Sequence, residues 1–413
     1  MSDTITAPSA FNKIWNTTDA FDGLLLQFPG RVFVSWDSSI DTTAIATVST
    51  DSNAILDLLS FNVSTATGDE ILVGCNQHFV IDHPDQTYLN ISATSNEDVR
   101  AVGTLLLHVV VKKPLSWIKS FAETVINNGA LINGPTKHVS IASLGSGNVS
   151  ASVRYPVTLA NLTLTSISAG SVQFNAASTL NAIELISIAV TGEGAVALQA
   201  SDLKTKGLHT SVSGAGSAFV TALNAINASE VHSTIAGDGE VNYYPSGKTI
   251  NNTITISGNG VANTGSLLAQ NASVVVSGKG EAVVQVVDTL TASISGKGKV
   301  EYYNATVPAH VPKPSGWWLW SSPGALPTAV NSFDSFNFTA DPADVPVNVS
   351  IELNRSRFSH CIAQHFETDV SLSATPASTT ELMSISVFAL VAFVVAFIIM
   401  KSKRRNGYTA LPK

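Results

Sequence analysis

The chain has 413 residues, of which 13% are charged and 45% are hydrophobic. A chain of this length can bury a large core, and its low charge with abundant Ser, Thr and Asn favours an uncharged β-structure over a cytosolic enzyme. The net charge of −8, with no basic cluster before the last residues, excludes nucleic acid as the expected partner.

The first part of the chain is predicted to introduce and cover a larger fold. Residues 1–14 are expected to be disordered, and residues 15–136 to form an N-terminal β lead-in. Alternating apolar residues predict strands at 24–28, 31–36, 70–73 and 104–111, whereas 115–127 is predicted to be a short helix or an amphipathic connector. Because the terminal unit of a stacked fold needs a cover, we expect the lead-in to cap the first turn.

Residues 137–305 repeat a Gly-x-Gly pair every 18–24 residues. The apolar residues around each pair alternate with polar ones, which is the period of a half-buried strand. Glycine reaches bent conformations at no steric cost, so the pairs are predicted to be corners between strands. These corners are Gly145, Gly147, Gly170, Gly192, Gly194, Gly214, Gly216, Gly237, Gly239, Gly258, Gly260, Gly278, Gly280, Gly296 and Gly298.

One such repeat cannot bury its apolar face alone, so neighbouring repeats must stack. We therefore predict an all-β fold: a right-handed parallel β-helix, or β-solenoid, of about eight rungs spaced by about 4.8 Å. A phosphate-binding loop would need a third glycine and a helix, and a calcium-binding repeat would need a nine-residue period with aspartates. Neither pattern is present, so the glycines are predicted to be structural.

The repeated turns resemble a known family. They are Val212-Ser213-Gly214-Ala215-Gly216, Ile256-Ser257-Gly258-Asn259-Gly260, Val276-Ser277-Gly278-Lys279-Gly280 and Ile294-Ser295-Gly296-Lys297-Gly298, the last closing on Val300-Glu301-Tyr302. With the lead-in, they resemble the auto-transporter adhesin head domain family, or head GIN domain, over about residues 15–305. The resemblance implies a β-helix-like surface domain with an adhesive role and no catalytic residues. The chain departs from the family in its charged middle residues and in its C-terminal segment.

Residues 306–381 change character. Prolines interrupt any strand ladder, and Trp317, Trp318 and Trp320 cluster among them. The tryptophans could stack on glycan rings or close the end of the solenoid, and we favour the closing role. Residues 333–372 are predicted to form a small set of strands, followed by a flexible stalk at 374–381.

The apolar segment at 382–400 predicts a single transmembrane helix, and the basic residues that follow place the tail, 401–413, in the cytosol. The body would then lie outside, at the plasma membrane or in an endolysosomal compartment. The chain has candidate N-glycosylation sites, which are consistent with a body outside the cytosol. They start at Asn16, Asn62, Asn90, Asn148, Asn161, Asn227, Asn251, Asn271, Asn304, Asn337, Asn348 and Asn354.

Two features at the ends of the chain bear on its compartment. No apolar stretch of signal-peptide length stands at the N-terminus. The body is therefore either outside, with a signal peptide missing from this sequence, or cytosolic and tail-anchored, and we favour the first. In the tail, Tyr408 and Leu411 form a Tyr-x-x-apolar pattern that resembles a sorting signal, so a sorting adaptor is a candidate partner.

The sequence indicates no catalytic site, metal site or cofactor. Two groups offer metal-binding side chains but lack the spacing of a closed zinc site, namely His78/Asp82/His83/Asp85 and His360/Cys361/His365. The sequence does not decide whether Cys75 and Cys361 form a disulfide. We predict a non-catalytic adhesive domain that contacts cell-surface glycans or proteins. The alternatives are a structural glycoprotein without a specific ligand and a polysaccharide-active β-helix enzyme, whose site would need carboxylates on adjacent rungs.

Overall fold

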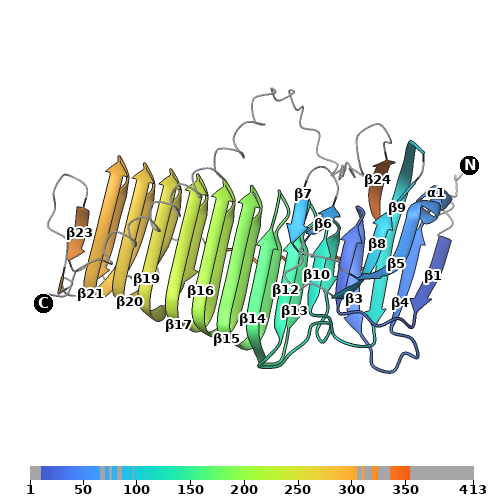
Figure 1. The fold of residues 1–413 in the computed structure, drawn as a ribbon, viewed down its shortest axis with the longest axis horizontal. Coiled ribbons are helices and arrows are strands. Elements are labelled where there is room, and N and C mark those ends of the chain that lie inside the picture. The colour runs from blue at the N-terminus through green and yellow to red at the C-terminus, as the bar shows by residue number, and fades with distance from the viewer. Residues whose placement is uncertain are drawn as a thin grey trace, which may run out of the picture. The chain divides into compact units, whose positions relative to one another are not determined.

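The computed structural model describes residues 11–65, 70–73, 77–80, 86–95, 97–304, 309–310, 319–323 and 335–353. Of 70–73, 77–80, 303–304 and 319–323, only the main chain is described. These residues form a parallel β-solenoid whose strands stack along one axis (Figure 1). The all-β fold predicted from the period-2 pattern is confirmed, and the solenoid makes about seven turns where about eight were expected.

Each turn contributes a strand to two main faces. The upstream face, which precedes the glycine corners, contains β2 (Gly23–Gln27), β10 (Trp117–Ser120), β12 (His138–Ser143), β14 (Val157–Ser166) and β19 (Gly247–Gly258). The downstream face contains β3 (Arg31–Trp36), β11 (Glu123–Ile126), β13 (Val149–Val153), β18 (Glu240–Tyr244), β22 (Lys299–Asn304) and β23 (Leu319–Pro323). Five long strands run through both faces: β15 (Val172–Gly192), β16 (Ala195–Gly214), β17 (Ser217–Gly237), β20 (Val261–Gly278) and β21 (Glu281–Gly296).

The first turns of the stack come from the lead-in. β10 pairs in parallel with both β2 and β12, and β11 pairs with both β3 and β13. The prediction of a short helix or an amphipathic connector at 115–127 is therefore wrong, because this segment forms β10 and β11. Its residues Trp117, Ile118 and Val125 gain burial as strands between neighbouring rungs, which overrides the local helical pattern.

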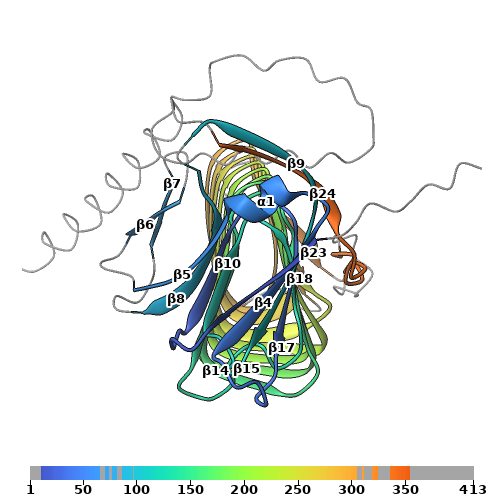
Figure 2. The same ribbon diagram turned by 90° about the vertical axis from the view of Figure 1, so that its right-hand side faces the viewer.

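The N-terminal end is closed by the chain between β3 and β10, which pairs in parallel with β2 and β3 and antiparallel within itself. It contains β4 (Ala44–Thr50), α1 (Asn53–Leu58), β5 (Leu59–Thr65), β8 (Thr87–Ala93) and β9 (Val99–Val111), with β1 (Phe11–Thr17) on β4 and the hairpin β6 (Glu70–Val73)–β7 (Gln77–Val80). α1 lies across the end of the stack and buries Ile55 and Leu58 (Figure 2). The helix thus covers the apolar core at this end of the stack.

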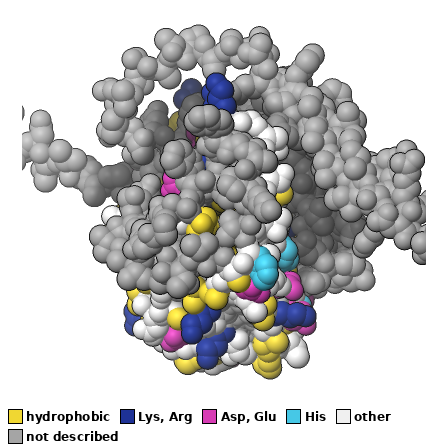
Figure 3. Space-filling model, turned by 90° about the vertical axis from the view of Figure 1, so that its left-hand side faces the viewer, with side chains coloured by type: hydrophobic (Ala, Val, Ile, Leu, Met, Phe, Trp, Pro, Cys, Tyr) yellow, Lys and Arg dark blue, Asp and Glu magenta, His cyan; other side chains and the backbone are white. Residues whose placement is uncertain are grey.

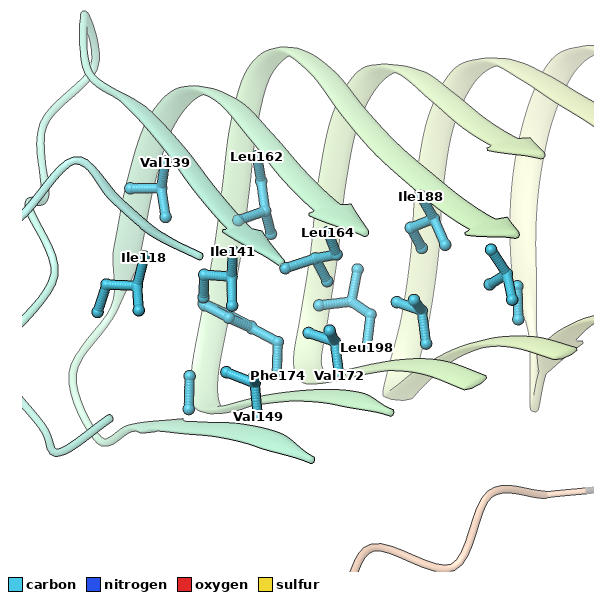
Figure 4. Close-up of a cluster of buried hydrophobic side chains, with 14 of the residues drawn as sticks. Ile118, Val139, Ile141, Val149, Leu162, Leu164, Val172, Phe174, Ile188 and Leu198 are labelled. Atoms are coloured by element: carbon cyan, nitrogen blue, oxygen red, sulfur yellow. The ribbon is translucent and has the colours of Figure 1, made fainter. Parts of the chain in front are cut away.

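The core is built from columns of side chains that repeat once per turn. Ile118, Ile141, Leu164 and Ile188 stand opposite one another on successive strands and point into the same core (Figure 4). The positions predicted to point inward after the glycines are buried, among them Val196, Ala218, Val241, Ala262, Ala282 and Val300. The period-2 pattern therefore identified the buried side of these strands.

A cluster of three hydroxyl groups interrupts the apolar columns, and its members hydrogen-bond to one another. The fully buried Tyr243 hydroxyl lies 2.9 Å from the Ser233 hydroxyl and donates to the Thr210 hydroxyl at 2.9 Å. Thr210 and Ser233 occupy the column that contains Ile188 and Ile254 on the flanking rungs. The small polar residues thus stand where the large Tyr243 reaches across the core, which satisfies its hydroxyl.

A segment from beyond the solenoid returns along the downstream face and is called the strap (residues 335–353). Phe336 packs on Phe219 of β17, Thr339 exchanges hydrogen bonds with Gln173 of β15, and Asp341 accepts one from Ser150 of β13. The strap ends in β24 (Val347–Leu353), which pairs antiparallel with β9 (Figure 1). It therefore crosses the stack from a middle rung back to the N-terminal cap.

The predicted C-terminal transmembrane helix is corrected. Within the described part of the chain no helix is long and apolar enough to cross a membrane. α1 has six residues and would span only about 9 Å, whereas a bilayer core is about 30 Å thick. Residues 382–400, on which the prediction fell, lie outside the described residues.

Candidate functional site

The glycine corners stand in register along the stack. Gly192, Gly214, Gly237, Gly258, Gly278 and Gly296 pair in sequence from rung to rung and have φ between 109° and 125°. The second glycine of each pair has another constraint. A Cβ on Gly239 would lie 2.6 Å from the carbonyl oxygen of Gly216, one rung earlier. The first glycine is therefore needed because the backbone bends with a positive φ. The second is needed because two corners approach too closely to leave room for a side chain.

Next to these corners, the upstream face presents a charge-free outer surface, here called the hydroxyl face. Its outward side chains come from 187–191, 209–213, 232–236, 253–257, 273–277 and 291–295, and none of these described residues is Asp, Glu, Lys or Arg. Most are Ser or Thr, such as Thr255, Ser257 and Ser277, which are exposed. The hydroxyls repeat about every 4.8 Å between rungs and about 6.6 Å along a strand, which gives a two-dimensional array of donors and acceptors.

A polar hollow of about 410 Å³ adjoins one edge of the hydroxyl face. Glu230, Asn251, Asn271 and Thr289 line it and stand opposite one another on four successive rungs. The Asn271 amide donates to the Asn251 carbonyl oxygen at 3.3 Å. The hollow thus offers carboxylate, amide and hydroxyl groups to a hydrogen-bonding ligand.

Two histidines lie at this hollow: His232 lines it, and His209 lies next to His232. His209 and His232 pair in register on β16 and β17, with ring centroids 4.8 Å apart, and the His232 Nε2 lies 3.8 Å from a Glu230 carboxylate oxygen. Partial burial and the neighbouring His232 lower the pKa of His209, against the opposing effect of Glu230. His209 is therefore held toward its neutral form, in which one ring nitrogen is free to accept a hydrogen bond.

Two carboxylates and a basic side chain lie together on the downstream face, as a polysaccharide-cleaving site would need. Lys299 donates to Glu281 on the adjacent rung at 2.6 Å and to Glu301 on its own rung at 3.1 Å. Partial burial works to lower the pKa of Lys299, but the bonds to these two carboxylates raise it overall. Both carboxylates thus share one ammonium, which is the arrangement of an ion-pair ladder.

At the end of the stack that carries β21 and β22, His side chains and acidic side chains lie next to each other on one flank (Figure 3). The described residues include one such pair, in which the His310 Nδ1 lies 3.2 Å from the Asp288 carboxylate. Trp320 pairs with Glu301 between β22 and β23, so the tryptophan-rich segment adds a strand to the stack. Trp317 and Trp318 lie outside the described residues.

The structure distributes the other predicted residues over the surface. Asn16, Asn62, Asn148, Asn227, Asn251, Asn337 and Asn348 are exposed, whereas Asn90, Asn161 and Asn271 are partly buried. Of these, Asn251 and Asn271 are brought together in the hollow. Asn354, Tyr408, Leu411, both cysteines and the His360/Cys361/His365 group lie outside the described residues, and no side chain is described for the His78 group or Asn304.

His209, His232 and Glu230 were missed by sequence reasoning, although a signal existed. His209 and His232 are separated by 23 residues, which is also the separation of Gly216 and Gly239. Aligning the rungs on their glycines would have placed the two rings side by side. Among the described residues, no group of three or more His, Cys, Asp or Glu side chains is placed so that it could hold a metal ion.

Comparison with known proteins bears on this solenoid directly. Residues 223–306 match the model of the family described as "Putative auto-transporter adhesin, head GIN domain", which confirms the resemblance over that stretch. No curated protein matches the sequence.

Three of the solved structures that resemble the chain are described as putative adhesins. One from Parabacteroides distasonis is 15% identical with a TM-score of 0.43, covering 71% of this chain and 97% of its own. One from Bacteroides fragilis is 16% identical with a TM-score of 0.44, covering 62% of this chain and 97% of its own. One from Parabacteroides merdae is 16% identical with a TM-score of 0.37, covering 71% of this chain and 96% of its own.

Proposed function

Since residues 223–306 belong to the auto-transporter adhesin head GIN domain family, we propose that the solenoid is a non-catalytic adhesive domain exposed at a cell surface. The family match is the observation that carries this proposal. The matched residues supply four of the six rungs of the hydroxyl face, so the proposed contact surface and the family segment largely coincide.

The hydroxyl face is the proposed contact surface, and a neutral glycan is the proposed ligand class. Sugar hydroxyls both donate and accept hydrogen bonds, as Ser and Thr hydroxyls do. The side chains are held on paired strands, so little ordering would be needed on binding. A surface without charge contributes neither attraction nor repulsion toward an ionic partner, which favours an uncharged one.

The test is binding of the full chain to immobilised neutral glycans and to intact cells. We expect Thr255→Lys together with Ser277→Lys to lower binding at least tenfold, because two ammonium groups would interrupt the hydroxyl array. Leu223→Lys is the matched control, since this 61% exposed side chain lies at another corner. Equal binding by all three proteins would contradict the proposed surface and favour a structural role without a specific ligand.

A polysaccharide-active enzyme is the second candidate, because Glu281 and Glu301 lie on adjacent rungs on either side of Lys299. Carboxylates with a basic partner are the groups that polysaccharide cleavage uses. Incubation with polysaccharides and assay of new reducing ends or unsaturated products would test it. Activity lost in Glu301→Gln would favour this candidate over adhesion.

A further inference from the structure

The polar hollow at the edge of the hydroxyl face has a regular construction. One row of its side chains runs from Glu230 to Thr289 over four successive rungs, and a second row runs from His232 to Thr291. The second row stands two residues further along each strand, so both rows project to the same side of the sheet. Three rung steps of about 4.8 Å make each row about 14 Å long. The hollow is therefore elongated along the stack and longer than one six-membered sugar ring.

The lining of the hollow indicates a polar ligand without charge. Small-molecule sites are usually lined by apolar side chains, but Ala272 is the one apolar residue among the described residues that line this hollow. None of those lining residues is Lys or Arg, so an anion would meet Glu230 without a positive partner. A cation would meet a single half-exposed carboxylate, a contact that contributes little to binding. A ligand that offers several hydroxyl groups matches the lining best.

We propose that the hollow binds a neutral hexose residue of the glycan through two neighbouring ring hydroxyls, with Glu230 as their acceptor. The proposal rests on the proposed adhesive function and names the part of the glycan that is read. The two oxygens of a carboxylate can each accept a hydrogen bond, so Glu230 can accept from both hydroxyls of the pair. A Glu230 oxygen lies 3.8 Å from the His232 Nε2, which is longer than a hydrogen bond, so this contact leaves the oxygen able to accept.

The asparagines of the first row supply the complementary donors. The Asn271 amide donates to the Asn251 carbonyl oxygen at 3.3 Å. A side-chain amide carries two N–H donors, so Asn271 keeps one for an oxygen of the sugar. The pairing of β17, β19 and β20 fixes the backbone of this row before a ligand binds, which lowers the cost of ordering. An acceptor at Glu230 and a donor at Asn271, two rungs further on, would orient the bound sugar along the stack.

The experiment is NMR titration of the full chain with the methyl glycosides of glucose, galactose and mannose as probes. The chain is produced without N-glycans, because Asn251 and Asn271 are candidate glycosylation sites in the hollow itself. We expect at least one probe to shift the amide resonances of Glu230, Asn251 and Asn271. Glu230→Gln should weaken that binding about tenfold, because a hydrogen bond to a charged acceptor is stronger than one to a neutral acceptor. One of the singly deoxygenated analogues of that probe should lose a similar factor, because it lacks one hydroxyl of the pair.

Glu193→Gln is the matched control, since it makes the same change of charge at an exposed corner outside the hollow. Circular dichroism of each variant verifies that the solenoid remains folded. Unshifted resonances with all three probes, or equal binding by Glu230→Gln and Glu193→Gln, would overturn the proposal.

Binding to immobilised neutral glycans separates this proposal from the proposed function. Loss of binding in the Thr255→Lys/Ser277→Lys variant together with full binding by Glu230→Gln would overturn the hollow alone. Full binding by the lysine variant would instead contradict the hydroxyl face, so the two failures are distinguishable.

Discussion

The buried hydroxyl of Tyr243 offers a sharp test of how the core is built. Tyr243→Phe keeps the ring and removes only the oxygen, which lies 2.9 Å from both the Ser233 and the Thr210 hydroxyls. Each buried hydrogen bond contributes roughly 0.5–1.5 kcal/mol, so we expect a loss of about 1–3 kcal/mol in the free energy of unfolding. The loss arises because the Thr210 and Ser233 hydroxyls, which lie on neighbouring paired strands, are left without their shared partner.

The measurement is urea unfolding followed by far-ultraviolet circular dichroism, with amide exchange of β17 and β18 to locate the effect. Tyr244→Phe is the control, because the next side chain points away from the core and its change should stay within about 0.5 kcal/mol. The triple variant Tyr243→Phe/Thr210→Val/Ser233→Ala removes the whole polar group and should recover part of the loss. A single variant as stable as Tyr244→Phe, or a triple variant weaker than the single one, would refute the reasoning.

Three further predictions concern the corners, the strap and alkaline pH. Gly239→Ala should destabilise the solenoid by about 1–3 kcal/mol in urea unfolding, since its Cβ would lie 2.6 Å from the Gly216 carbonyl oxygen, whereas Ala215→Ser at the exposed middle position should not. Arg31→Met removes the ion pair with Glu123 and the bonds to the Ala343 and Val345 carbonyls, so limited proteolysis should cut the strap faster than in Arg154→Met. Burial raises the pKa of Tyr243 above its unfolded value of about 10, against the opposing bonds to Ser233 and Thr210, so its contribution is present below that pH and is lost as pH rises further. The parent chain should therefore lose more stability above pH 10 than Tyr243→Phe, and equal losses would count against this.

The inward columns of the repeats could be predicted because alternation is local. Val212, Ile235 and Ile256 precede their glycines by two residues, and each is buried. The expected strands at 31–36 and 70–73 have the bounds of β3 and β6. In each case the pattern that decides burial lies within one strand, so no knowledge of distant segments was needed.

The rungs formed by the lead-in and the position of the strap could not be predicted. The bends of these rungs lack the Gly-x-Gly pair, and the strap pairs with a distant segment. β2 and β3 are joined across Phe28-Pro29-Gly30, and β10 and β11 across Phe121-Ala122, with no Gly-x-Gly at either bend. The strap pairs with β9 across more than 200 residues of chain, as in Val347 opposite Leu105. Such pairing depends on where the completed stack places β9, and no local pattern of 335–353 contains that information.

The composition of the hydroxyl face is not required by the fold, and this supports a contact role. The downstream face of the same solenoid carries Arg31, Glu123, Glu281 and Lys299, so a stacked parallel sheet tolerates charge on its outer side. The corner positions tolerate it as well, with Glu193, Asp238 and Lys279 between the glycines. Stacking therefore does not require that the six segments of the hydroxyl face lack Asp, Glu, Lys and Arg. The proposed contact role would account for an uncharged surface of this regularity, and the lysine substitutions at Thr255 and Ser277 test that explanation.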